Sequence, residues 1–166
     1  MRKVLFTVFV VALAWCAGTT IASAQATTNQ TLTINATVSA RVTLTLSVAA
    51  VTFGDADPDV TNPIVLTDVL TITAKARVGA AQGVTLTAAA AGPLTSGSDT
   101  IPIGNVSWTC SGAGYVPGTM NTVAQAAGSW TGPGSYAGVH SFSLVNNWSY
   151  APGNYSTTVL YTLSAA

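Results

Sequence analysis

The stretch TLTINATVSARVTLTLSV, residues 31–48, decides the fold. From Leu32 to Val48 every even-numbered residue is apolar, and the odd-numbered residues between them are Thr, Asn, Ser and Arg. A period of two is typical of extended chain with one buried face. The 17 residues of this run exceed the about 3–10 residues of an ordinary strand. We therefore expect one of two arrangements: the chain bends into two strands, or its first half seeks a partner sheet in another molecule.

The residues before this stretch have the features of a secretory signal peptide. A basic start at Arg2 and Lys3 precedes an apolar segment, residues 4–17, and the small residues 22–24 form a cleavage site. The apolar segment is shorter than the about 20 residues that a membrane span needs. We expect residues 1–24 to be removed, residues 25–40 to form an N-terminal extension, and residues 41–166 to form one domain without a transmembrane span.

Charged residues are scarce, at 6% of the chain. After residue 24 the chain keeps three basic and five acidic side chains, a formal charge of −2, and it has no glutamate. Such a composition cannot neutralise a phosphate backbone, which excludes nucleic acid as a partner. A protein near zero net charge associates readily. We therefore expect an exported protein that packs against copies of itself or against a matrix.

The rest of the chain is predicted to consist of short strands separated by turns. Two turns stand out: Gly79 to Gly83 is expected to close a hairpin, and Ala151 to Asn154 to join the last two strands. The glycine-rich segment 112–138 is expected to be mostly loop, with one short strand near residues 129–131. This pattern predicts an all-β, antiparallel, immunoglobulin-like sandwich. The expected strands after the first run are residues 51–53, 70–78, 84–88, 101–109, 142–150 and 155–163.

The tryptophans divide into a core candidate and a surface candidate. Trp148 alternates in phase with Phe142 and Leu144, which predicts that it packs in the core. Trp130 lies between Ser129 and Thr131 in the glycine-rich segment and is the best candidate for an exposed ligand contact, for example with a sugar. The competing interpretation is that it fills the core, as large aromatic side chains commonly do.

The acidic residues suggest one possible metal site. Asp55, Asp57 and Asp59 alternate along a short segment, and alternate carboxylates can converge on calcium. The segment lacks the central glycine and the terminal glutamate of an EF-hand loop. Aspartate and proline are also ordinary turn residues after a strand, so a plain turn is the competing interpretation. No other cofactor is expected.

The residues needed for catalysis are missing from the pattern. His140 is the only histidine, and no serine lies in a G-x-S-x-G elbow. Without glutamate or a paired carboxylate outside a turn, general acid–base chemistry has no partners. We therefore expect that the protein is not an enzyme and that His140 is a surface or edge residue. Cys110 is the only cysteine after the signal peptide. It is therefore either a buried free thiol or forms a disulfide with another molecule.

A family resemblance follows from three features: the alternating N-terminal run, the Val51-Thr52-Phe53-Gly54 step, and a last strand that carries Val159, Tyr161 and Leu163. Together they resemble secreted pilins of the chaperone–usher class, with a pattern similar to the spore coat protein U type subunits. Those subunits usually carry a disulfide near the start of the domain, where this chain has no cysteine.

The resemblance implies an incomplete sandwich that lacks one strand and is completed by the N-terminal extension of the next subunit. The donor strand would be residues 31–39, with Val42 to Val48 as the first strand of the subunit's own fold. The last strand would be gripped by a periplasmic chaperone at the groove edge, and an outer-membrane usher would be a further partner. The inserted donor side chains would be Leu32, Ile34, Ala36 and Val38.

The sequence therefore predicts a structural subunit of a bacterial pilus, fimbrium or other surface filament, exported through the periplasm. The alternative is a monomeric cell-surface domain that binds polysaccharide or matrix. In that case residues 31–48 fold back as two strands of a closed sandwich, and Trp130 contacts the ligand.

Overall fold

The structure, a computed structural model, describes residues 27–166. It divides into two units: a first one of which residues 27–36 are described, and a second one, Thr37–Ala166. In the described part of the first unit, residues 27–36 have no strand or helix assignment and all their side chains are exposed. The predicted signal peptide, residues 1–24, lies outside the described residues, as do residues 25 and 26.

The regular secondary structure of the second unit consists of strands and one 3₁₀ turn at Ile103–Asn105. Its β-branched and alternating segments form the strands, because such side chains pack well on a pleated surface. The strands are β1 (Arg41–Leu46), β2 (Ile64–Val65), β3 (Leu70–Arg77), β4 (Gly83–Ala90), β5 (Leu94–Ser96), β6 (Asp99–Ile101), β7 (Val106–Ser111), β8 (Gly118–Thr119), β9 (Gln125–Thr131), β10 (Gly134–Leu144) and β11 (Val159–Ala165).

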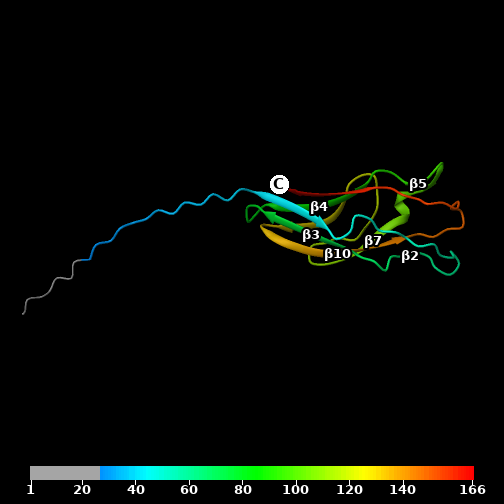
Figure 1. The fold of residues 1–166 in the computed structure, drawn as a ribbon, viewed down its shortest axis with the longest axis horizontal. Helices are drawn as coiled ribbons and strands as arrows, with labels where there is room; N and C mark the ends of the chain where they lie inside the picture. Colours follow the sequence, from blue (N-terminus) through cyan, green and yellow to red (C-terminus); the bar gives the residue numbers. More distant parts are fainter. Residues whose placement is uncertain (1–26) are drawn as a thin grey trace, which may run out of the picture. The chain divides into compact units, whose positions relative to one another are not determined.

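These strands form an antiparallel sandwich of two layers (Figure 1). The large sheet has the order β1-β3-β10-β7-β8, with β2 paired to the end of β10, and the small sheet has the order β11-β4-β9. The short strands β5 and β6 pair only with each other. The predicted all-β antiparallel fold is confirmed.

The strand order is immunoglobulin-like. An immunoglobulin constant-type sandwich pairs strands A, B, E and D in one sheet and C, F and G in the other. Here β1, β3, β10 and β7 occupy the positions of A, B, E and D, while β4 and β11 occupy those of C and F. Among the described residues, no strand occupies the G position beside β11.

The core lies between the two sheets and contains both small and large apolar side chains. On β3 and β4 every second side chain is buried, which reproduces the period-two pattern of the sequence. The most enclosed large side chains are Trp108, Ile72, Leu86, Met120, His140 and Val84. His140 is fully buried, so the prediction of a surface or edge histidine is wrong.

Two predicted connections differ from the structure. The turn at Gly79–Gly83 forms, with the Gln82 side chain accepting a hydrogen bond from the Gly79 amide at 2.8 Å. It does not close a hairpin, however, because β3 belongs to the large sheet and β4 to the small one. The last connection likewise leads from β10 in the large sheet to β11 in the small one. Turn residues determine that the chain reverses, but not which sheet receives the next strand.

Several predicted strands have other bounds. No strand forms at residues 51–53. The segment expected at 101–109 contains the last residue of β6 and the 3₁₀ turn before β7 begins. The segment 112–138, expected to be mostly loop, contains β8, all of β9 and the start of β10. Its glycines are compatible with strands because they lie under large aromatic rings: a Cβ on Gly128 would lie 2.4 Å from the Trp130 ring. No helix among residues 27–166 is long and apolar enough to cross a membrane.

Candidate functional site: an open groove between two edge strands

The site is the open side of the sandwich, where the two sheets end in β1 and β11. Both strands are edges: β1 pairs only with β3, and β11 pairs only with β4. The two edges approach one another without pairing. Each therefore presents a row of backbone N–H and C=O groups that no other strand of the described chain uses.

Apolar side chains line this opening from both walls. On β1, Val42, Leu44 and Leu46 lie opposite the buried Ala76, Ala74 and Ile72 of β3, so they point to the core side of the large sheet. Val42 and Leu46 nevertheless remain 37% exposed. Since their neighbours on β3 are buried, this exposure arises because no strand covers the edge.

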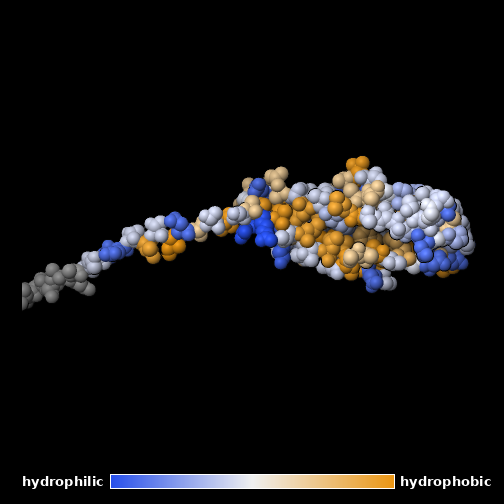
Figure 2. Space-filling view, turned by 45° about the horizontal axis from the view of Figure 1, so that its top comes forward, coloured by the Kyte–Doolittle hydropathy of each residue, from blue (hydrophilic) through white to orange (hydrophobic). Residues whose placement is uncertain are grey.

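The opposite wall has the same character. Four residues of β11 face their buried partners on β4 and are only half-buried: Val159, Tyr161, Leu163 and Ala165. Their partners Ala88, Leu86 and Val84 are fully buried. We name the opening between β1 and β11 the edge groove. Figure 2 shows apolar side chains gathered along this face of the domain.

The floor of the edge groove contains a polar contact between the sheets. The Tyr161 hydroxyl of β11 lies 3.1 Å from Nδ1 of His140 on β10. Burial lowers the pKa of His140 to about 4, so the imidazole is neutral at physiological pH. Burial also raises the pKa of Tyr161. His140 Nε2 has no hydrogen-bond partner among the described residues. A second proton on the imidazole would create a buried charge without a partner, which is costly in free energy.

Aromatic rings surround this histidine and fix its position. His140 stacks against Trp108 with a centroid separation of 5.8 Å, and Tyr115 and Phe142 meet it edge-on. The pair is therefore a buried polar anchor between β10 and β11, with one end open to the edge groove through Tyr161.

The edge groove is narrow where its walls come closest. Some Cα atoms of β1 and β11 lie within 8 Å of each other. A strand that pairs with neighbours on both sides needs about 9.5 Å between them, which is twice the spacing of adjacent strands. An added strand can therefore pair fully with one edge only, or with both after the walls move apart.

The N-terminal extension carries the complementary apolar row. Leu32, Ile34 and Val38 are 82%, 84% and 68% exposed, and Ala36 is exposed in phase with them. Residues 27–40 have no strand assignment, so the long alternating run contains one strand, β1, rather than two. The first half of the run thus has an apolar face without a covering sheet within the described chain.

Trp130 does not form an exposed contact. It is 9% exposed, its indole Nε1 donates to the Ala113 carbonyl at 2.7 Å, and its ring stacks on Tyr136 at 4.7 Å. The prediction that it is exposed is wrong because the ring turns inward from β9. The sequence signal for this burial was Gly114, which belongs to the same glycine-rich segment and lies beside the ring in the fold: a Cβ on Gly114 would lie 2.3 Å from the indole nitrogen.

Trp148 shows the opposite difference. It was predicted to lie in the core, but it is 69% exposed, and its Nε1 donates to Asp59 Oδ1 at 3.1 Å. Strand β10 ends at Leu144, and the buried Asn146 amide then donates to the carbonyls of Ala56 and Thr61. These bonds take the chain out of the ladder, so the period-two pattern no longer holds at Trp148.

The aspartate segment has the geometry of a turn. Asp57 Oδ1 accepts from the Asp59 amide at 2.9 Å, and the Asp57 carbonyl accepts from Val60 and Thr61. Among the described residues, no three His, Cys, Asp or Glu side chains are grouped so that they could hold one metal ion. Asp55, Asp57 and Asp59 are therefore not brought together as a ligand set. Cys110 is half-buried on β7.

The structure adds functional candidates that the sequence did not predict. No sequence pattern predicted that β1 forms a wall of a groove or that His140 contacts Tyr161. Comparison with known proteins gives no further guide: no protein-family model, no curated protein and no solved structure matches this chain.

Proposed function

We propose that this protein is an exported structural subunit that polymerises by donor-strand exchange into a pilus or other bacterial surface filament. The residues 31–39 of one copy would enter the edge groove of another and take the vacant position beside β11. A periplasmic chaperone and an outer-membrane usher would be its assembly partners. The observation that carries the proposal is the match between an extension with an exposed apolar row and an uncovered apolar groove in the same chain.

The energetics agree with insertion as a complete strand. Burial of Leu32, Ile34 and Val38 contributes about 1.5–3 kcal/mol each. Ordering the backbone costs about 1–2 kcal/mol per residue, so these three side chains alone do not hold the nine residues 31–39 as a strand. The remaining stabilisation comes from main-chain hydrogen bonds to β11, about 0.5–1.5 kcal/mol each, and from covering the half-exposed side chains of both walls.

The arrangement of the chain favours exchange between copies. To pair residues 31–39 with β11 of the same molecule, the chain would need a reversing loop before β1 begins at Arg41. Only Ala40 lies between Ser39 and Arg41, so one residue is left for that loop. Even the tightest hairpin connection uses two residues. A second copy has no such restriction.

The surface-binding alternative gains no support. It required residues 31–48 to form two strands and Trp130 to face solvent. In the described chain that stretch contains one strand, and Trp130 is buried. We therefore propose no second function.

The test is a pair of substitutions on opposite faces of the extension. Ile34→Asp places a charge on the face to be buried, whereas Thr33→Asp adds the same charge on the other face. We expect both variants to be exported and folded, but only Ile34→Asp to abolish polymer in size-exclusion chromatography and negative-stain microscopy. Filaments formed by Ile34→Asp as readily as by the unmodified protein would contradict the proposal.

A further inference from the structure

The charged side chains of the second unit are sorted to its two ends. Arg41 begins β1, and Lys75 and Arg77 lie at the end of β3 beside it, with Arg41 paired to Arg77 and Thr43 to Lys75. These three are the only Lys or Arg residues after residue 24, and all are exposed. The guanidinium of Arg77 also donates to the Ser39 carbonyl at 3.0 Å. We name this the arm end, because the N-terminal extension joins the domain here.

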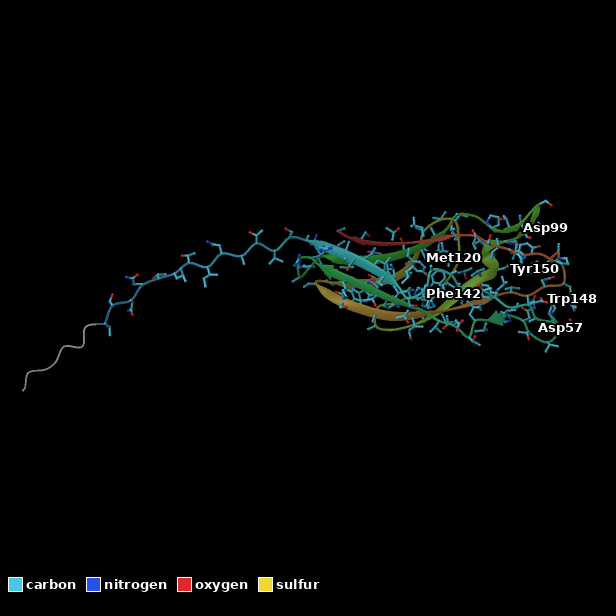
Figure 3. All side chains as sticks on the ribbon, viewed as in Figure 1. Asp57, Asp99, Met120, Phe142, Trp148 and Tyr150 are labelled. Atoms are coloured by element: carbon cyan, nitrogen blue, oxygen red, sulfur yellow. The ribbon has the colours of Figure 1, made fainter. Side chains whose placement is uncertain are left out.

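The aspartates lie at the other end. Asp68 lies two residues before β3, and Asp99 is the first residue of β6. The loop of residues 55–59 carries the remaining aspartates, Asp55, Asp57 and Asp59. Figure 3 shows Asp57, Asp99 and Trp148 together at the end of the domain opposite the start of β1. We name this the aspartate end. The loop is fixed there by the bonds from the Asn146 amide to Ala56 and Thr61.

The separation between the two ends is large on the electrostatic scale. Strand β3 connects them with eight residues, which corresponds to about 26 Å of extended chain. The Debye length at physiological ionic strength is about 8 Å. The cations and the aspartates therefore hardly attract each other within one molecule, and each group is free to act on a neighbouring molecule.

The direction of β11 relates these ends to the edge groove. Strand β3 ends at the arm end, β4 begins there, and β11 is antiparallel to β4. Strand β11 therefore runs from the aspartate end to the arm end. An inserted extension that lies antiparallel to β11 leaves the groove at the aspartate end of the acceptor. The domain of the donor molecule begins at Arg41, two residues after its inserted segment ends at Ser39.

From this geometry we infer that consecutive subunits are joined by an electrostatic junction between two copies of this chain. The arm end of the donor, with Arg41, Lys75 and Arg77, meets the aspartate end of the acceptor, with the Asp55–Asp59 loop. Insertion parallel to β11 would instead bring two arm ends together, with three cations against three. The charge pattern thus favours a head-to-tail order. This inference rests on the proposed function.

The test uses charge reversal at each end of the full exported chain. Asp55→Lys with Asp59→Lys reverses the aspartate end, and Arg41→Asp with Lys75→Asp reverses the arm end. Thr109→Lys, an exposed position in the middle of β7, controls for a change of net charge away from both ends. Assembly is followed by light scattering at 20 and 500 mM NaCl, and the products by negative-stain microscopy. Ile34→Asp is included as the variant that lacks a functional donor strand.

We expect each reversal alone to slow assembly by about tenfold at low salt, the lower limit of electrostatic steering effects. Combining both reversals should restore the rate, because opposite charges meet again. The unmodified protein and Thr109→Lys should assemble at similar rates and should slow down at high salt.

Two results would overturn the junction. If polymer forms and depends on Ile34, but the single reversals assemble at the unmodified rate, the junction is wrong and donor-strand exchange stands. If the unmodified protein forms no polymer under any of these conditions, the proposed function and the junction fail together.

Discussion

At the residue scale, His140 shows how a buried polar side chain can escape prediction. In the sequence His140 lies in phase with Phe142 and Leu144, and serines occupy the positions between them. This alternation is typical of a core position. A lone histidine in a glycine- and serine-rich segment nevertheless suggests a surface residue. Its burial follows from tertiary contacts: the Tyr161 hydroxyl comes from a strand 21 residues away, and no local pattern encodes that approach.

The buried histidine predicts a pH-dependent stability. Burial lowers the pKa of folded His140 to about 4 from the ordinary 6.5, so between these values the unfolded chain binds the additional proton. The free energy of unfolding is then complete above about pH 6.5 and falls as the pH drops toward 4. We expect a loss of about 2–3 kcal/mol between pH 7.5 and 4.5, and urea denaturation at the two pH values would measure it.

The matched control for this prediction is His140→Phe, which keeps an aromatic ring in the same aromatic surroundings and cannot be protonated. Its stability should change much less between the two pH values. An equal pH dependence in both proteins would assign the effect to the aspartates rather than to His140.

Trp130 and Trp148 give the second lesson at this scale. Both were placed by local pattern, one by its glycine neighbours and the other by the period of two. The glycines proved to be space for the indole ring, and the period ended where Asn146 bonds to another loop. Side-chain direction was therefore predictable within a strand but not beyond its end.

At the element scale, the strands with strict alternation were predictable and those rich in glycine were not. Strands β1, β3, β4 and β11 fall within the predicted ranges or overlap them, because period-two patterning is a property of the chain itself. Of β9 only the last residues, 129–131, were predicted as a strand, and the first residues of β10 were missed, since glycine weakens strand propensity and is typical of loops. Which sheet each strand joins depends on the whole fold.

The N-terminal extension and the edge groove can also be tested as separate elements. The Ile34→Asp chain should be unable to donate a strand but should retain an open groove. A synthetic peptide of residues 27–40 should therefore bind to it and stabilise it. At a concentration of 100 times the dissociation constant, the stabilisation is about 2.7 kcal/mol, which a domain of this size shows as a rise in Tm of roughly 10 °C.

The control for this experiment is the same peptide with Ile34→Asp, which should leave Tm unchanged. Differential scanning calorimetry measures both. Equal stabilisation by the two peptides would mean that the apolar face of the extension is not what the chain binds.

At the scale of the whole molecule, the central claim is that the vacant strand position beside β11 is filled by another copy. The chain contains both halves of this arrangement: an extension with an exposed apolar row and two uncovered sheet edges. The sequence predicted the first half from its alternation. It predicted the last strand as a groove edge by resemblance. The opposite wall became visible only in the structure, where β1, an edge strand of the other sheet, approaches β11.

The most direct test is intermolecular disulfide formation between two mixed populations, both with Cys110→Ser. The donor carries Ile34→Cys. The acceptors carry one cysteine at each position of β11 from Leu160 to Ala165. Paired strands keep side chains of one face together, and a disulfide needs Cα atoms about 4.4–6.8 Å apart.

We predict donor–acceptor disulfides at one or two of the inward positions Tyr161, Leu163 and Ala165, and none at the outward positions Leu160, Thr162 and Ser164. Cross-links of equal yield on both faces, or polymers that form with no cross-link at any inward position, would contradict the account.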